Sequence, residues 1–214
     1  WYFIFLLFYI GTLPVQGKIT LPAILSDNMV LQQKAQVRFW GKARPGEKVT
    51  VSTSWDKNIY TVQTPTDGHW EVKIKTPGVM DNQTLTVKGE NTITIHNILI
   101  GEVWLCTGQS NMEFLLKYDE GADEMHNIPQ DPMLRYFRYP QTSFLGQLER
   151  DAFPDDGFWR KWDSVENRDH FSAPAAYMGH RLRAVLGVPV GFVGCNWGGT
   201  PAAAWTAAEE LDAV

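Results

Sequence analysis

Between residues 18 and 97 the chain alternates apolar and polar positions with a period of two. The alternation is clearest in four runs, at Lys48–Thr53, Trp70–Lys75, Thr84–Lys88 and Thr92–His96. This pattern buries one face of a strand and leaves the other face in water, as in an antiparallel sheet. Turns rich in Pro, Gly, Asp and Asn separate the runs. The pattern therefore predicts an antiparallel β-sandwich over residues 18–97.

Three tryptophans fall within this predicted sandwich, at positions Trp40, Trp55 and Trp70. Exposed tryptophans on a β-sandwich can bind sugar rings, whereas buried ones fill the space between the sheets. Large aromatic side chains dominate such cores, which favours the second interpretation and leaves sugar binding as the alternative.

Beyond residue 97 the pattern changes to short apolar runs followed by turns that contain glycine. Val103–Cys106 and Val190–Cys195 are nearly continuous apolar runs, as in strands buried on both faces. Ala173–Leu186 has the character of a helix. Strand, turn and helix in repetition predict an α/β layer with its site at the carboxyl ends of the strands. The expected fold class is α+β in two domains, with the second over residues 98–214.

The segment Tyr118–Phe171 shows no clear periodicity, so we expect a functional insertion or a binding loop there. Its aromatic side chains, among them Phe153, Phe158, Trp159 and Trp162, either form a rim around a substrate cleft or anchor the loop to the domain.

The N-terminal run Trp1–Ile10 is entirely apolar, and small residues follow at Val15 and Gly17. This order predicts a secretory signal peptide over residues 1–17 and a secreted or periplasmic mature protein. A retained anchor is the alternative, although the run is shorter than the roughly 20 residues of a membrane span.

Composition narrows the expected partners. The 214 residues hold 19 Lys and Arg against 24 Asp and Glu, a formal net charge of −5, so a nucleic-acid binder is not expected. The two cysteines, Cys106 and Cys195, cannot form a disulfide framework. We expect buried free thiols, with one disulfide as the alternative.

The strongest candidate for chemistry is Ser110, in the turn between an apolar run and a helix start. Its hydroxyl would stand at the mouth of the sheet, and its N–H at a helix N-terminus could stabilise an oxyanion. The turn with Gly198 and Gly199 would face the same crevice and supply a second donor. A helix N-cap for Ser110 or Asn111, and a plain turn for the glycines, are the alternatives.

Side chains beside these turns are candidate substrate contacts: Gln109, Asn111 and Trp197. Glu113 could also touch substrate, but an acidic residue in the first turn of a helix already suits the helix dipole.

Six sequence blocks occur in a recognisable order: Leu25–Gln33, Gly101–Trp104, Gly108–Met112, Phe171–Ala173, Pro189–Gly191 and Asn196–Thr200. Together they resemble the sialate O-acetylesterase family of SGNH-type carbohydrate esterases, over nearly all of residues 21–206. The resemblance implies a β-sandwich followed by a flavodoxin-like (SGNH) α/β domain. It implies serine-dependent hydrolysis of acetyl esters on sugar hydroxyls, without a metal or an organic cofactor. By motif position it implies Ser110 as the nucleophile, and Ser110, Gly198 and Gly199 as the oxyanion hole.

Members of that family carry a Gln-Gly-Glu block and an Asp-x-x-His block well after the Gly-Gly-Thr turn, and neither follows Thr200 here. The string Asp123–His126 is interpreted as a chance match, because triads are defined by geometry. For His170 and His180 we expect surface or core roles. The chain is therefore expected to be a fragment that lacks the catalytic His and Asp and is inactive or nearly so alone.

An acetylated carbohydrate is the expected partner. The sequence predicts no stable membrane insertion after signal removal and no particular oligomeric state. The alternative to an esterase is a non-catalytic sugar-binding protein with a degenerate esterase remnant, and in a third hypothesis the β-domain only braces the catalytic one.

Overall fold

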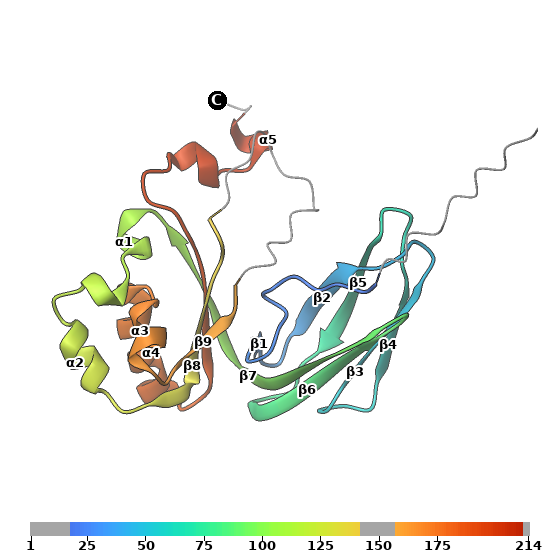
Figure 1. Cartoon of the computed structure of the whole chain (residues 1–214), viewed down its shortest axis with the longest axis horizontal. Coiled ribbons are helices and arrows are strands. Elements are labelled where there is room, and N and C mark those ends of the chain that lie inside the picture. The colour runs from blue at the N-terminus through green and yellow to red at the C-terminus, as the bar shows by residue number, and fades with distance from the viewer. Residues whose placement is uncertain (1–17, 142–156, 212–214) are drawn as a thin grey trace, which may run out of the picture.

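The computed structural model describes residues 18–141 and 157–211 (Figure 1). The expected signal peptide and Phe153 lie outside the described residues. The strands are β1 (Val30–Gln32), β2 (Gln36–Lys42), β3 (Lys48–Thr53), β4 (Ile59–Gln63), β5 (His69–Lys75), β6 (Met80–Lys88), β7 (Thr92–Gly108), β8 (Asp131–Arg138), β9 (Trp159–Trp162) and β10 (Val190–Asn196). The helices are α1 (Ser110–Glu113), α2 (Ala122–Asn127), α3 (Val165–Asp169), α4 (Ala173–Leu186) and α5 (Ala208–Leu211), with short 3-10 turns η1 (Leu116–Tyr118) and η2 (Ala202–Trp205).

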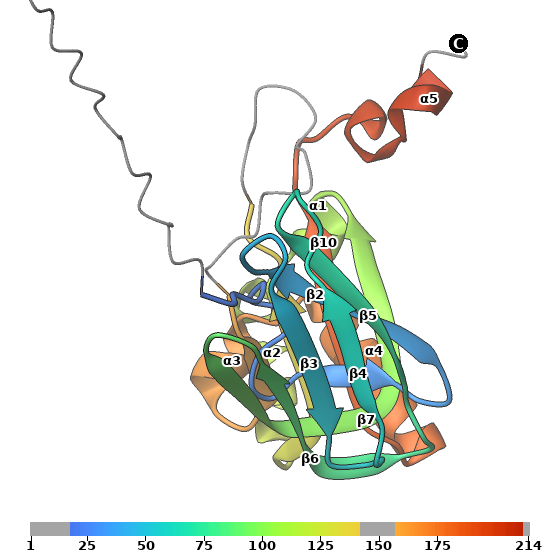
Figure 2. The same cartoon turned by 90° about the vertical axis from the view of Figure 1, so that its right-hand side faces the viewer.

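A single mixed sheet runs through the molecule in the order β4-β3-β6-β7-β10-β8-β9, with β1 also paired to β7. Its antiparallel strands β3, β4 and β6 lie in front in Figure 2. The separate two-stranded sheet β2-β5 packs across these strands. The α+β class is therefore confirmed, and the sheet that carries it is continuous across residue 97.

Strand β7 joins the two kinds of sheet. Its first part pairs antiparallel with β6, and its last part pairs parallel with β10 from Glu102 to Gly108. Within the part that pairs with β6, the register shifts near Asn97, which has a φ of 53°, and the strand bends at this irregularity. The division into domains at residues 18–97 and 98–214 stays a prediction, because the division point falls inside this shared strand.

A buried arginine holds the bend. Arg135 of β8 donates hydrogen bonds to the carbonyl oxygens of Asn28 and Asn97, at 2.7 and 2.6 Å, and to Asn97 Oδ1 at 3.0 Å. Burial lowers the pKa of this guanidinium to about 10. A buried cation is tolerated where several oxygens accept its hydrogens, so Arg135 ties the parallel strands to the antiparallel ones.

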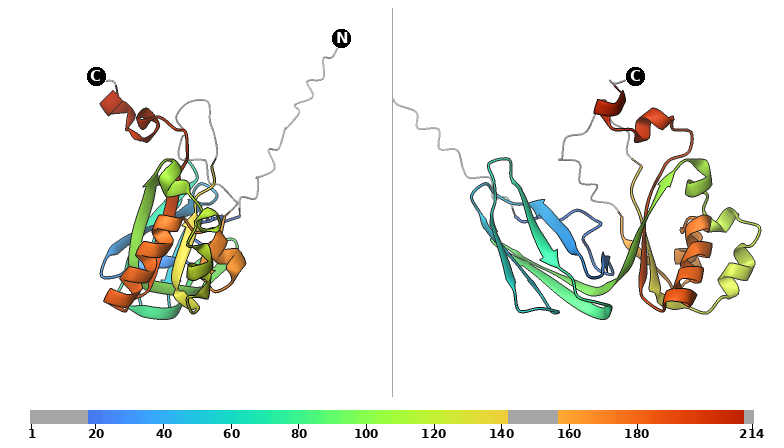
Figure 3. Two further views of the ribbon diagram at one scale, coloured as in Figure 1. Left: turned by 90° about the vertical axis from the view of Figure 1, so that its left-hand side faces the viewer. Right: turned by 180° about the vertical axis from the view of Figure 1, so that it is seen from behind.

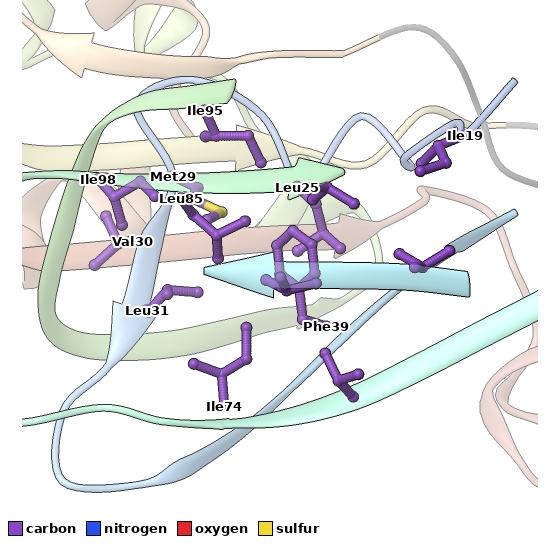
Figure 4. Close-up of a cluster of buried hydrophobic side chains, with 14 of the residues drawn as sticks. Ile19, Leu25, Met29, Val30, Leu31, Phe39, Ile74, Leu85, Ile95 and Ile98 are labelled. Atoms are coloured by element: carbon purple, nitrogen blue, oxygen red, sulfur yellow. The ribbon is translucent and has the colours of Figure 1, made fainter. Parts of the chain in front are cut away.

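Two cores form on opposite faces of the parallel strands. The first fills the space between the β2-β5 sheet and the larger sheet, and Figure 4 shows part of it, including Phe39 and Ile74. Trp70 belongs to it and is 1% exposed, so its predicted core role is confirmed. Trp40 and Trp55 are half-buried and pack against the same core. The second core lies under the helices, which cover the face away from the antiparallel part (Figures 1 and 3).

The expectation of a long irregular insertion over Tyr118–Phe171 is wrong for its described residues, 118–141 and 157–171. This segment contributes β8, β9, α2 and α3, and β8 is an inner strand paired parallel with β10. Arg135 interrupts the apolar run of β8 and so hides the strand from a hydrophobicity pattern. Trp159 and Trp162 are buried anchors at 3% and 0% exposure, and Phe158 is exposed.

Two further expectations concern strand and helix boundaries. The helix over Ala173–Leu186 is confirmed, because the Ser172 side chain caps its start and Gly187, at a φ of 67°, ends it. The burial expected for Val103–Cys106 on both faces is wrong for two residues, because Trp104 is 41% and Leu105 66% exposed. Within the described residues, this part of β7 pairs only with β10, so its other edge is uncovered.

Candidate active site

Ser110 stands at the carboxyl end of β7. The strand ends at Gly108, whose φ of 143° lies in the region that favours glycine, and α1 begins two residues later. The N-cap of α1 is Gln109, and no side chain caps this helix. The alternative that Ser110 or Asn111 acts as the N-cap is therefore wrong, and the Ser110 hydroxyl is not used for capping.

The diglycine turn lies against this serine. Strand β10 runs parallel to β7 with Asn196 opposite Gly108, so both strands end at the same level. The Trp197 N–H donates to the Gly108 carbonyl at 3.0 Å. A Cβ built on Gly198 would lie only 3.3 Å from Ser110 Oγ. The structure thus brings together the two motifs that the sequence analysis singles out.

The serine opens to solvent. Ser110 is exposed and lines a cleft of about 390 Å³ together with Gly108, Gln109, Asn111, Met112 and Pro174. A neighbouring hollow of about 230 Å³ shares Asn111 and Pro174 and continues to Phe114 and Tyr177. A substrate can therefore reach the hydroxyl without any rearrangement of the core.

Glu113 connects the serine helix to the diglycine turn. Its Oε2 accepts the Gly198 N–H at 2.5 Å. Its Oε1 accepts hydrogen bonds from Gln141 Nε2 at 2.6 Å and Arg138 at 3.1 Å. The hydrogen bond from Gln141 lowers the pKa of Glu113 most, and the Gly198 N–H and the Arg138 charge lower it further against the opposing effect of burial. The carboxylate therefore stays ionised and fixes the position of Gly198.

The contact between Glu113 and Gly198 reduces the number of N–H groups that could bind an oxyanion. The Gly198 N–H is already paired with Glu113. Within the described ranges, the N–H groups of Ser110 and Gly199 meet no hydrogen-bond acceptor. Gly199 is exposed and has a φ of 78°. Of the expected donors, Ser110 and Gly199 are the ones available to a ligand in this conformation.

The weaker candidates are placed as follows. The Gln109 amide donates to the Thr200 carbonyl and so ties the serine turn to the diglycine turn. Asn111 is exposed in the cleft, and Trp197 is half-buried. Sequence reasoning missed the contribution of Arg138 and Gln141, which lie 25 and 28 residues from Glu113 and carry no local motif.

The histidines have other surroundings. His180 packs edge-on against Trp162, with ring centroids 4.3 Å apart, and His126 Nε2 lies 2.9 Å from Asp169 Oδ1. His170 Nδ1 contacts the Glu166 carbonyl. Among the residues that the structure describes, no histidine makes a hydrogen bond to Ser110.

Cys106 and Cys195 are both free thiols on adjacent strands, so the expectation of free thiols is confirmed. Burial is confirmed for Cys106, whereas Cys195 is half-buried. Burial raises the pKa of the Cys106 thiol to about 11. In residues 18–141 and 157–211, no group of three or more His, Cys, Asp or Glu side chains is arranged to hold a metal ion. The helices of these ranges are also too short or too polar to cross a membrane.

Comparison with known proteins gives consistent relatives. No family model matches the chain. It is 33% identical over 207 residues to the sialate O-acetylesterases of Pongo abelii and Homo sapiens, matches that cover 88% of this chain and 39% of each relative. Among solved structures, a carbohydrate acetylesterase from Xanthomonas citri superimposes with a TM-score of 0.82 at 30% identity, covering 91% of this chain and 44% of that one.

The chain thus spans about two fifths of the length of the curated relatives that it matches. The structural similarity covers nine tenths of the chain. On this evidence the chain belongs to the sialate O-acetylesterase family.

Proposed function

We propose that the protein to which this chain belongs is an exported carbohydrate O-acetylesterase with Ser110 as its nucleophile. The observation that carries the proposal is the placement of the Ser110 hydroxyl, exposed in a cleft with the diglycine turn against it. The names of its relatives support this reaction class, because they are a sialate O-acetylesterase and a carbohydrate acetylesterase. The sequence of residues 1–17 supports export.

In the proposed reaction Ser110 Oγ attacks the carbonyl carbon of an acetyl ester on a sugar hydroxyl. A base takes the serine proton, and the carbonyl oxygen becomes an oxyanion that accepts hydrogen bonds from the N–H groups of Ser110 and Gly199. Collapse of this intermediate breaks the ester bond, and the sugar oxygen leaves with the proton. Water then hydrolyses the acetyl-serine and releases acetate.

The general base that would take the serine proton is not among the residues of the described site. Ser110 makes no hydrogen bond to a histidine within the described ranges. The relatives are more than twice as long as their match with this chain. We place the histidine and its orienting acid in the polypeptide that corresponds to the remaining length. Residues 1–214 alone would then keep only the roughly 10³–10⁴-fold acceleration over water that oxyanion stabilisation and binding provide.

The experiment compares acetate release by the full-length protein and by its Ser110→Ala variant, from acetylated xylan and from O-acetylated sialic acid. We expect the variant to lose about 10³-fold or more in kcat/KM. Ser52→Ala is the matched control, because Ser52 is an exposed serine on β3 whose loss should leave the rate unchanged. Equal rates for wild type and Ser110→Ala would remove Ser110 from the mechanism. Glycan binding without acetate release by the wild type would favour the sugar-binding alternative.

A further inference from the structure

A second hollow lies on the two-stranded sheet, on elements separate from those that carry Ser110. In β2, Phe39 points into the core at 0% exposure, so strand alternation places Arg38 and Trp40 on the opposite face, where Trp40 is half-buried and also packs against the core. In β5 the alternation places Glu71 on that same face, directly across from Trp40 in the strand register. These side chains, with the turn that follows β4, line a pocket of about 580 Å³.

The size and lining of this pocket suit a small polar ligand with an apolar face. Pockets for small molecules usually measure roughly 300–1,000 Å³ and combine apolar walls with a few placed polar groups. Here Trp40 and Pro65 supply the apolar wall. The polar groups are Arg38, Asp67 and Glu71, and Arg38 donates to Glu71 Oε2 through Nε at 3.0 Å and through NH2 at 2.5 Å. This ion pair joins the two strands on the face that carries Trp40.

The charges decide between classes of ligand. The lining holds the carboxylates of Asp67 and Glu71 beside the guanidinium of Arg38 and the imidazole of His69. Arg38 is paired with Glu71, and His69 Nδ1 lies 3.8 Å from Asp67 Oδ2, so a carboxylate stands beside each of these groups and an anion such as a phosphate or an acidic peptide is disfavoured. A neutral sugar fits both features. Its hydroxyls donate to carboxylates and accept from guanidinium N–H groups, while its C–H face carries slight positive charge and is attracted to the negative face of an indole.

From this arrangement we infer that the outer face of the β2-β5 sheet is a binding site for a neutral sugar unit, with Trp40 as the stacking platform. The inference goes beyond the proposed esterase function and does not require Ser110 to be a nucleophile. Such a site would hold a glycan chain on the protein independently of the ester that is cleaved.

The test measures binding to the intact protein by isothermal titration calorimetry. The probes are unacetylated hexasaccharides of xylose, glucose, mannose and N-acetylglucosamine, with sialyllactose as the anionic comparator. None carries an O-acetyl ester, so the result does not depend on catalysis. We expect at least one neutral probe to bind and to be preferred over sialyllactose. Trp40→Ala should weaken that binding about tenfold or more, because truncating a tryptophan anchor is among the costliest changes at a binding site.

Two further variants separate a binding role from a structural one. Trp40→Phe keeps an aromatic face and should bind within about threefold of wild type. Ile59→Ala changes an exposed residue of β4 that does not line the pocket, and it should bind like wild type. Absence of binding to all four neutral probes, or binding that Trp40→Ala leaves unchanged, would overturn the inference. Self-association that is lost in Trp40→Ala would assign the face to a second copy of the chain and would also overturn it.

Discussion

Replacing Gly198 by alanine tests the contact between the diglycine turn and the serine. The φ of Gly198 lies outside the left-handed region, so alanine fits the backbone and the change adds only a methyl group. That methyl would stand 2.9 Å from Glu113 Oε2 and 3.3 Å from Ser110 Oγ. The other carboxylate oxygen of Glu113, Oε1, accepts hydrogen bonds from Gln141 and Arg138. The carboxylate can therefore move away from the methyl group only if these hydrogen bonds weaken.

The expected loss of activity follows from the strength of the hydrogen bond between the Gly198 N–H and Glu113. A hydrogen bond to a charged group contributes about 1.5–3 kcal/mol, and each 1.4 kcal/mol is tenfold in rate. If the methyl group displaces Glu113 from the Gly198 N–H, the turn loses this restraint, and kcat/KM should fall about 10–100-fold. The assay is hydrolysis of 4-nitrophenyl acetate by the full-length protein, with the melting temperature measured alongside.

Gly78→Ala is the matched control, because a Cβ there meets only Lys34 Cε at 3.8 Å, an ordinary contact. It should keep both activity and stability. A folded Gly198→Ala protein with kcat/KM within about twofold of wild type would refute the inference that Gly198 abuts a catalytic serine.

Two other predictions concern charged groups. The pKa of Glu113 is held below its ordinary value of 4.5, so its contribution to stability is complete above pH 4.5 and is lost as the pH falls through the lowered value. Melting curves should therefore show wild type losing its advantage over Glu113→Gln only in that acid range, and an advantage that persists there would contradict this role. Arg135→Met should lower the free energy of unfolding in urea by about 2–4 kcal/mol, because the carbonyls of Asn28 and Asn97 lose their buried donor. An unchanged urea midpoint would mean that Arg135 does not hold the bend.

The elements that the sequence predicts correctly are those with purely local signals. In strands β3 and β5, the alternation of apolar and polar side chains is by itself enough to identify the buried face. Helix α4 carries its own start and stop signals in Ser172 and Gly187, which explains why its predicted bounds agree with the structure.

The elements that the sequence hides depend on distant partners. Strand β8 reads as irregular because Arg135 interrupts its apolar run, and the acceptors that make this burial tolerable lie 38 and 107 residues away. Leu105 is predicted to be buried because it lies in an apolar run, but such a run does not show whether a neighbouring strand covers the residue, which is exposed in the structure.

The candidate site also contains some residues that local sequence signals identify and others that they do not. Ser110 and the diglycine turn are recognisable from strand, turn and helix signals and from the family resemblance. The role of Glu113 is not, because its partner Gly198 lies 85 residues further along the chain. The pocket beside Trp40 also depends on the pairing of β2 with β5, which no local pattern fixes.

The most direct test of the esterase account is covalent trapping of the nucleophile. The full-length protein is treated with diisopropyl fluorophosphate, digested with trypsin and analysed by mass spectrometry, with and without acetylated xylan as a competitor. The tryptic peptide Gly89–Lys117 contains one serine, Ser110. We predict that Ser110 Oγ displaces fluoride and that this peptide carries a diisopropylphosphoryl group on Ser110, in parallel with loss of acetate release and with protection by the competitor. Complete inactivation with an unmodified Ser110 would contradict the account.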